Sequence, residues 1–220
     1  MNISILMVDD HLAILEGYEL LLSYHPDKPT IKTKKITSLQ EANEFIHNER
    51  KFKHVDIAII DLSIPAYPEA KLMDGKDLAI KIKQLNPKIK ILIVTSYSEP
   101  LLLYKIHNVV KPNGILIKSE LDGNALHNAL SALKSNKTYN SEAVTIGFEK
   151  IEKHTKKFDE LDLDMILYLY QGVKTKYLPE KLNLNISTIN HRKKAIKEVF
   201  KVEYGGDEDI VNKAKSLGIL

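Results

Sequence analysis

The chain has 220 residues, of which 44% are hydrophobic and 28% charged, a balance typical of a folded globular protein with room for two small domains. It contains no cysteine, which excludes disulfide frameworks and thiolate chemistry. The formal net charge of +3 is too small to identify a partner. No apolar run approaches a membrane span, and the first residues lack the pattern of a secretory signal, so we expect a cytoplasmic protein.

Residues 1–135 alternate apolar runs typical of buried strands with the three- and four-residue repeats of amphipathic helices. One such repeat joins Leu12, Leu15, Tyr18 and Leu22. The alternation predicts an α/β domain with a doubly wound, five-stranded parallel sheet that is covered by helices on both faces. The predicted strands are Ile3–Val8, Ile31–Ile36, Val55–Ile60, Ile89–Val94 and Ile115–Ile117.

The strand pattern ends after residue 135. Residues 136–157 have a weaker pattern and end in a lysine-rich stretch, so we expect a linker there, partly helical. Residues 158–220 contain only helical patterns, which predicts a small all-α domain. The expected organisation is therefore 1–135, 136–157 and 158–220.

Polar side chains follow four of the predicted strands. Asp9 and Asp10 follow the first, Asp61 the third, Thr95 the fourth and Lys118 the fifth. In an open parallel sheet the carboxyl ends of the strands form the ligand site, so these side chains should converge. Clustered carboxylates need a cation, and Mg²⁺ prefers oxygen ligands. A lysine and a hydroxyl would receive an added phosphoryl group, which makes Asp61 a candidate nucleophile that forms an aspartyl phosphate.

This constellation resembles the receiver domain of bacterial two-component response regulators. The matching residues are Asp9, Asp10, Asp61, Pro65, Thr95 and Lys118. The resemblance implies a flavodoxin-like fold and phosphorylation of Asp61 by a sensor histidine kinase. It also implies that Asp10, Asp61 and the Ser63 backbone carbonyl bind Mg²⁺ with help from Asp9. We expect His11 to lie outside the metal set, because Mg²⁺ prefers oxygen.

The sequence departs from the receiver pattern beside the expected site. Residues 66–72, "AYPEAKL", separate Pro65 from Met73-Asp74-Gly75 by about six residues more than the family has. The resemblance also places Tyr97, two residues beyond Thr95, on the rim of the path by which water reaches the phosphorylated aspartate. Its ring either covers that path or turns outward as part of the signalling face.

Residues 174–201 carry eight Lys or Arg against two Glu. They include a predicted helix that begins near Ser187 and turns apolar residues such as Ile189 and Ile196 inward. A short helix pair with a basic face on its second member suits insertion into the DNA major groove. The candidate DNA contacts on that face are Asn190, His191, Lys193, Lys194 and Lys197.

The same region resembles the helix-turn-helix output domain of LuxR-type regulators. The residues that carry the resemblance are Gly172, Leu182, Leu184, Thr188 and Ile189. Asn190 and Arg192 replace the Lys and His of the family pattern. Pro179 falls inside the second predicted helix, where we expect it to bend or shorten that helix.

Together these features predict a phosphorylation-dependent transcription regulator rather than an enzyme. Its expected partners are a sensor histidine kinase, promoter DNA and, when phosphorylated, a second copy of the chain. The alternative is a protein–protein signalling module whose degenerate helical domain does not bind DNA. A hydrolase that uses Asp61 on small phosphate esters is disfavoured, because no second acid follows Asp61 at a spacing suited to general acid catalysis.

Overall fold

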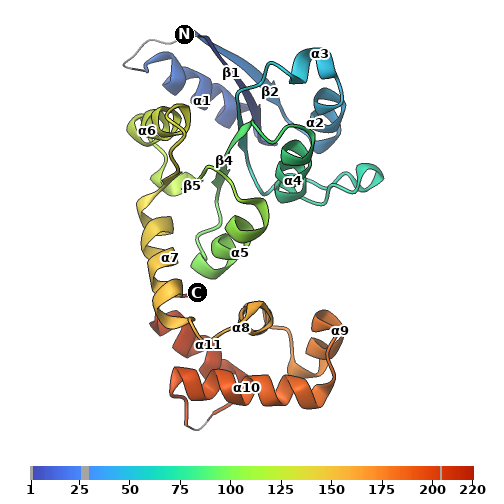
Figure 1. Ribbon diagram of the computed structural model, residues 1–220, viewed down its shortest axis with the longest axis vertical. Helices are drawn as coiled ribbons and strands as arrows, with labels where there is room; N and C mark the ends of the chain where they lie inside the picture. The colour runs from blue at the N-terminus through green and yellow to red at the C-terminus, as the bar shows by residue number, and fades with distance from the viewer. Residues whose placement is uncertain (1, 26–29, 204) are drawn as a thin grey trace. The chain divides into compact units, whose positions relative to one another are not determined.

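The computed structural model describes residues 2–25, 30–203 and 205–220 (Figure 1). The chain divides into two compact units, Met1–Ser98 with Ile106–Val144 and Glu99–Lys105 with Thr145–Leu220. Within the described residues, no helix has both the length and the apolar character needed to cross a membrane.

The first unit is built on a parallel sheet in the order β2-β1-β3-β4-β5-β6. The first five strands follow the flavodoxin-like order, so the predicted doubly wound α/β fold is confirmed. The prediction of five strands was one too few, because a further strand pairs with β5 through Gly114–Tyr139 and Ile115–Asn140. Two residues are too few to produce a periodic pattern. The strands are β1 Asn2–Val8, β2 Thr30–Ile36, β3 Ile57–Ile60, β4 Lys90–Thr95, β5 Gly114–Ile117 and β6 Tyr139–Asn140.

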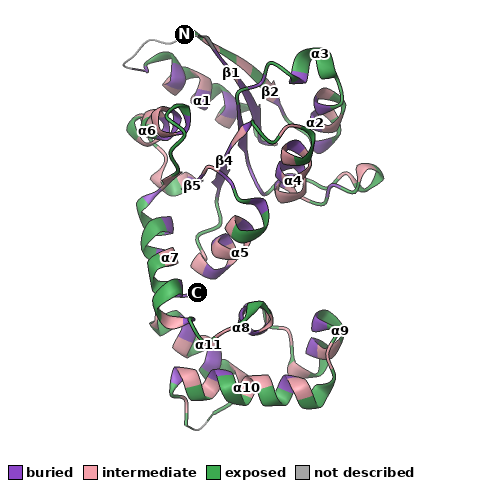
Figure 2. Ribbon diagram, in the orientation of Figure 1, coloured by how far each residue is buried: buried purple, intermediate pink, exposed green. Residues whose placement is uncertain are grey.

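Helices cover both faces of this sheet. The helices up to the end of the predicted linker are α1 Leu12–Ser23, α2 Leu39–Ile46, α3 Glu49–Phe52, α4 Gly75–Leu85, α5 Pro100–Val110, α6 Gly123–Lys134 and α7 Glu142–His154. Leu15 of α1 and Leu130 of α6 pack on Ile5 and Met7 of β1, while α2 and α4 lie on the other side of the sheet (Figure 1). The central strands are buried on both faces (Figure 2), as their unbroken apolar runs predict.

The register of the sheet brings two candidate residues together. β1 and β3 are neighbours, and Val8 pairs with Ile60 at their carboxyl ends. The backbone N–H of Asp61 donates to the Val8 carbonyl oxygen over 2.9 Å. Asp9 and Asp61 therefore leave adjacent strands at the same level, although 52 positions separate them in the sequence.

The enlarged loop at 66–72 has a compact form. Tyr67 and Leu72 form an antiparallel bridge, with backbone hydrogen bonds of 2.7 and 3.2 Å, around a 3₁₀ turn over Pro68–Ala70. Lys71 closes the turn in the left-handed region, at φ 57°. Leu72 is 2% exposed and anchors the end of the bridge. The insertion thus closes on itself and returns the chain to the position from which α4 begins.

The second unit contains the predicted helices of the C-terminal region. They are α8 Glu160–Tyr170, α9 Leu178–Leu182, α10 Ile186–Phe200 and α11 Asp207–Ser216, with a 3₁₀ turn at Thr175–Tyr177. Asp159 caps α8: its side chain accepts from the Asp162 N–H, and the Asp162 side chain accepts from the Asp159 N–H. Met165, Ile166, Ile189, Ile196 and Ile210 are fully buried and form the core.

The second helix is short, as expected, since α9 spans five residues after a 3₁₀ turn, but Pro179 does not lie in its interior. The structure starts α9 at Leu178, so Pro179 lies in its first turn. Backbone N–H groups there have no acceptor within the helix, and the missing N–H of proline therefore costs no hydrogen bond.

Candidate functional site

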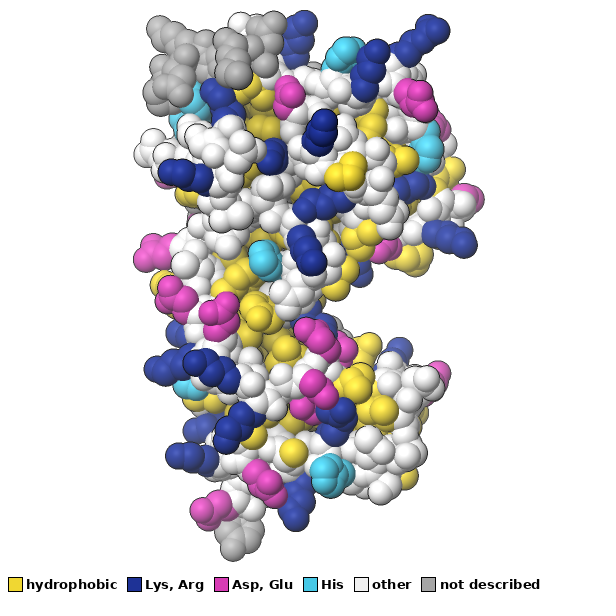
Figure 3. Space-filling view, in the orientation of Figure 1, with side chains coloured by type: hydrophobic (Ala, Val, Ile, Leu, Met, Phe, Trp, Pro, Cys, Tyr) yellow, Lys and Arg dark blue, Asp and Glu magenta, His cyan; other side chains and the backbone are white. Residues whose placement is uncertain are grey.

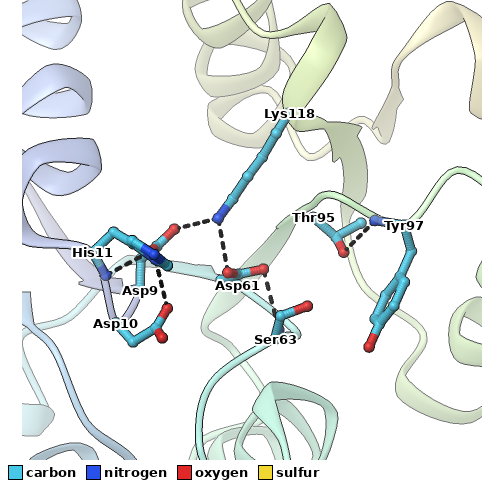
Figure 4. A network of polar contacts seen from close by, with 8 residues as sticks. All are labelled: Asp9, Asp10, His11, Asp61, Ser63, Thr95, Tyr97 and Lys118. Carbon is cyan, nitrogen blue, oxygen red and sulfur yellow. Dashed lines mark hydrogen bonds and ion pairs between the residues drawn. The ribbon is translucent and has the colours of Figure 1, made fainter.

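Lys118 joins two buried carboxylates at the carboxyl ends of β1 and β3. Its Nζ lies 2.8 Å from Oδ2 of Asp61 and 2.7 Å from Oδ2 of Asp9 (Figure 4). The side chains of Asp9 and Asp61 are 2% and 3% exposed, and that of Lys118 is 18% exposed. One ammonium therefore neutralises two carboxylates that would otherwise repel each other.

The charges at this site change the proton affinity of its neighbours. Burial lowers the pKa of Lys118, but its hydrogen bonds and charge interactions with Asp61 and Asp9 outweigh this, and the pKa is raised. Burial also raises the pKa of Tyr18, and the negative charges of Asp9 and Asp61 raise it further. Lys118 is therefore held as a cation and Tyr18 as a neutral phenol.

Asp10 supplies a carboxylate oxygen that could bind a metal ion. Its Oδ1 is buried and accepts no hydrogen bond. The nearby His11 Nδ1, at 2.8 Å, makes an ion pair with this oxygen only when the imidazole is protonated. Potential ligand atoms of Asp9, Asp10 and His11 all lie within 4.8 Å of one another. A buried carboxylate oxygen that accepts no hydrogen bond and lies among other carboxylates suits a hard cation such as Mg²⁺.

Ser63 and Thr95 flank Asp61. The backbone N–H of Ser63 donates to Asp61 Oδ1 over 3.2 Å, which places this residue beside the carboxylate. Thr95 is fully buried at the end of β4, and its Oγ1 accepts from the backbone N–H of Tyr97 over 3.1 Å. The Tyr97 side chain lies on the far side of Thr95 from Asp61 and is 40% exposed (Figure 4). The sequence left open whether the Tyr97 ring covers the path of water or turns outward, and in the structure it is turned outward.

The predicted DNA-contacting residues fall into two groups on α10. Asn190, His191 and Lys194 are exposed. Lys193 instead pairs with Asp207 and donates to the Thr175 hydroxyl over 2.8 Å, so that its side chain is only 16% exposed.

Two further basic residues of α10 are held by the protein itself. Lys197 donates to the Gly205 carbonyl oxygen over 2.5 Å. Arg192 pairs with Asp159 at 2.9 Å and with Asp162 at 2.8 Å, which ties α10 to the capping box of α8. The departure from the LuxR-type pattern at Arg192 therefore has a structural role within the C-terminal unit.

Comparison with known proteins places this site in a family. The model of the response regulator receiver domain matches residues 5–131, more than half of the chain. The chain belongs to the response regulator receiver family. It is 23% identical over 203 residues to the oxygen regulatory protein NreC of Staphylococcus epidermidis, a match that covers 86% of this chain and 87% of NreC.

Solved response regulators resemble the chain over nearly its whole length. A structure of two RcsB dimers bound to two parallel DNAs has a TM-score of 0.66 and 25% identity, and the match covers 98% of this chain and 99% of that one. RcsB of Salmonella enterica serovar Typhimurium, bound to promoter P1flhDC with the phosphomimetic BeF₃⁻, has a TM-score of 0.65 and 24% identity, covering 99% and 100%. The expectation of a receiver followed by an all-helical output region is confirmed.

Sequence reasoning did not assign a role to Gly75 in this receiver. Its N–H donates to the Leu62 carbonyl oxygen over 3.1 Å, and a Cβ at this position would overlap the Asp61 carbonyl oxygen. The signal was present in the Met73-Asp74-Gly75 triplet, which the sequence keeps after the insertion. Glycine permits the close approach of two backbones that sets the position of Asp61.

Proposed function

We propose that this response regulator accepts a phosphoryl group on Asp61 and thereby controls transcription through DNA binding by its C-terminal helices. The observation that carries the proposal is the position of Lys118 Nζ, which lies within hydrogen-bond distance of both Asp61 and Asp9 at the ends of adjacent strands. We assign the receiver to residues 1–135, a connecting segment to 136–157 and the output domain to 158–220.

Phosphorylation of Asp61 is a nucleophilic substitution at phosphorus. A carboxylate oxygen of Asp61 forms a bond to phosphorus while the bond to the donor breaks, and the donor leaves with the electron pair. The donor is the phosphorylated histidine of a sensor kinase or a small acyl phosphate. Lys118 is already hydrogen-bonded to the nucleophile and can transfer that hydrogen bond to a phosphoryl oxygen as negative charge accumulates.

Mg²⁺ fits the oxygen donors beside Asp61. Asp10, Asp61 and the Ser63 backbone carbonyl would hold it, with Asp9 close by. The buried Oδ1 of Asp10, which accepts no hydrogen bond, supports this assignment. When bound, the ion would neutralise the carboxylates and the incoming phosphoryl oxygens.

Thr95 links the phosphorylated site to the chain that follows β4. Its hydroxyl accepts from the Tyr97 N–H, at the start of the segment that leads to α5. A phosphoryl group on Asp61 offers strong acceptor oxygens, toward which the Thr95 hydroxyl can turn. The loss of its contact with Tyr97 then releases the local backbone, and this change is the signal that we propose favours dimerisation.

The DNA contact is assigned to the exposed face of α10. Lys194 would contact phosphates, while Asn190 and His191 lie nearer base edges, and all three are free of ion pairs among the described residues. We assign Lys193 and Lys197 a supporting contribution, since each already holds the C-terminal unit together. The similar RcsB proteins, one solved as dimers bound to DNA and one bound to a promoter, support this assignment.

The decisive experiment is incubation with acetyl phosphate and Mg²⁺, followed by intact mass and size measurement. We expect a gain of one phosphoryl group, a shift toward dimer and tighter duplex binding. Asp61→Asn should show none of these, and a mass gain that persists in this variant would exclude Asp61 as the acceptor. If the wild-type protein is phosphorylated but binds no duplex at any salt concentration, the alternative of a protein–protein signalling module is favoured instead.

A further inference from the structure

A pocket of about 410 Å³ opens at the amino-terminal edge of the receiver sheet, at the opposite end of the strands from Asp61. It lies where β1, β3 and β4 begin and where α6 ends. Its lining consists of Ile3, Lys53, Val55, Asp56, Ile57, Asn86, Lys88, Ile89, Lys90, Leu133, Lys134 and Asn136. None of these residues belongs to the site described above.

The pocket has an apolar floor and a cationic rim. The floor is formed by Ile3, Val55, Ile57, Ile89 and Leu133, each no more than 6% exposed. Lysine side chains supply most of the rim, and Figure 3 shows Lys and Arg side chains gathered around this end of the unit with hydrophobic side chains between them. The rim lysines are Lys53, Lys88, Lys90 and Lys134.

The rim carries a net positive charge, because four lysines stand beside a single acid in the described lining. In the part of the chain that the structure describes, none of the four lysines forms an ion pair. Asp56 is the one acid in the described lining, and its carboxylate is engaged by the Ser4 N–H at 2.8 Å. The pKa of the nearby Lys83 is lowered by burial and then by the positive charges of Lys90 and Lys111. Geometry and charge together therefore favour an anion at this edge.

The apolar floor indicates which class of anion fits the pocket. A pocket of this size is in the range that holds organic ligands, and a small inorganic anion would leave the apolar floor in contact with water. The ligand therefore needs a flat or apolar body as well as negative charge. Asn86 and Asn136 provide amide groups at the rim, and Asn86 uses its Oδ1 to accept from the Lys88 N–H, which leaves its NH₂ group available as a donor to a polar ring edge.

We propose that this pocket binds a nucleoside phosphate, with the base on the floor formed by Ile57, Ile89 and Leu133 and the phosphates among the rim lysines. Lysine binds phosphate as a point charge, so several lysines can share one diphosphate group without a fixed geometry. Binding at this edge needs neither Mg²⁺ nor Asp61. The inference is therefore independent of the proposed phosphorylation.

The test is calorimetric titration of the full-length protein with ADP in EDTA, alongside adenosine and pyrophosphate. We expect one ADP per chain and at least tenfold weaker binding of adenosine and of pyrophosphate. The double variant Lys88→Gln/Lys90→Gln should bind ADP at least tenfold more weakly. The matched control is Lys153→Gln/Lys157→Gln, which removes two exposed lysines outside the pocket and should leave the affinity unchanged.

Methyl NMR of the wild-type protein provides a readout that does not depend on the folding of a variant. ADP should shift the methyl signals of Ile57, Ile89 and Leu133 and leave those of Ile117, at the other edge of the sheet, in place. Absence of ADP binding at millimolar concentration would overturn the proposal, as would equal affinity for pyrophosphate and ADP. A double variant that lost thermal stability but kept its ADP affinity would also overturn the proposal. Lys88 and Lys90 would then stabilise the fold, for example at the carboxyl end of α4, without binding the ligand.

Discussion

The backbone of Gly75 packs directly against the backbone carbonyl of Asp61. The Gly75 N–H donates to the next carbonyl, that of Leu62, over 3.1 Å, and a Cβ at Gly75 would overlap the Asp61 oxygen and lie 3.0 Å from the Leu62 Cα. The first residue of α4 therefore positions the end of β3. The enlarged loop changes the path from Asp61 to Gly75 but not this contact, because the Tyr67–Leu72 bridge closes the insertion on itself.

Gly75→Ala should impair phosphorylation more than folding. The added methyl group must push α4 away from the Asp61 carbonyl, and overpacking of this kind costs about 1–3 kcal/mol. The displacement falls on the backbone of the nucleophile, so we expect a markedly slower mass gain from acetyl phosphate and Mg²⁺ together with a lower Tm.

Gly17→Ala is the matched control. Gly17 lies within α1, and an added Cβ would meet no atom within 4 Å. Alanine is a better helix former by about 1 kcal/mol, so this variant should be as stable as the wild type or more stable, with an unchanged phosphorylation rate. A Gly75→Ala protein that is phosphorylated at the wild-type rate would show that the contact does not position Asp61.

Lys118→Gln should make the receiver dependent on Mg²⁺ for its stability. Without the ammonium, Asp9 and Asp61 are two buried carboxylates without a counter-charge, and loss of one partner from a buried ion pair costs about 3–5 kcal/mol. A divalent cation beside Asp10 would restore part of this loss. We therefore expect a larger rise in Tm on addition of Mg²⁺ for the variant than for the wild type.

Lys35→Gln is the control for the removal of one lysine charge from an ion pair outside the phosphorylation site. Lys35 pairs with Glu19 at the partly exposed surface of β2, not with Asp9 or Asp61, and surface pairs of this kind contribute little. Its response to Mg²⁺ should equal that of the wild type. An equal Mg²⁺ response in Lys118→Gln would mean that the ion does not share carboxylates with Lys118.

The C-terminal unit should lose stability in acid through Asp207. Burial raises the pKa of this carboxyl, but its hydrogen bonds with Lys193 and Thr175 outweigh the effect of burial, and the pKa is lowered. A folded-state pKa below the unfolded value of about 3.9 gives stability that is present above pH 4 and is lost as pH falls through the folded pKa.

Comparison of Tm between pH 7 and pH 3 for wild type and Asp207→Asn tests this linkage. The variant should be less stable at pH 7, and the difference should shrink toward pH 3. Glu208→Gln is the control, because Glu208 lies in the same first turn of α11 but is exposed. A constant difference between wild type and Asp207→Asn over this pH range would exclude the carboxylate of Asp207 as its source.

The fold and the phosphorylation site were largely predictable because both depend on local patterns. Apolar runs predict the central strands, and the rule that parallel strands align their carboxyl ends predicts that Asp9 and Asp61 lie close together. The strand at Tyr139–Asn140 was not predicted, because its two residues are in a strand only through their pairing with β5. The position of Pro179 in the first turn of α9 could not be predicted, because sequence patterns place the start of a helix only to within about two residues.

The roles of the basic residues could not be predicted from charge alone. Lys193 and Lys194 are neighbours in the sequence, yet one is held by Asp207 and the other faces solvent. Likewise, the sequence shows Arg192 only as a departure from a family pattern. The structure explains the residue by its ion pairs with Asp159 and Asp162. Such pairings join residues of different helices, and no periodicity within a single helix encodes them.

Tyr97→Ala should leave the lifetime of the aspartyl phosphate nearly unchanged. The ring lies on the far side of Thr95 from Asp61 and is 40% exposed, and therefore does not cover the approach of water (Figure 4). We expect half-lives within about twofold of each other, a change of roughly 0.4 kcal/mol in the barrier. The measurement is decay of the phosphorylated mass after acetyl phosphate is removed. A tenfold faster decay in the variant would mean that the ring moves over the site on phosphorylation.

Lys194→Ala and Lys193→Ala should separate DNA contact from helix positioning. Lys194 is exposed, so its loss should weaken binding to all duplex sequences and reduce the slope of log affinity against log salt by about one, without a change in Tm. Lys193 holds Asp207 and Thr175, so its loss should lower the Tm of the C-terminal unit. Fluorescence anisotropy of a labelled duplex at several salt concentrations, paired with thermal unfolding, distinguishes the two. The opposite result would contradict this assignment. If Lys194→Ala changes only the preference among sequences, and Lys193→Ala reduces the salt slope at constant Tm, then the DNA phosphates contact the face of α10 that is turned toward α11.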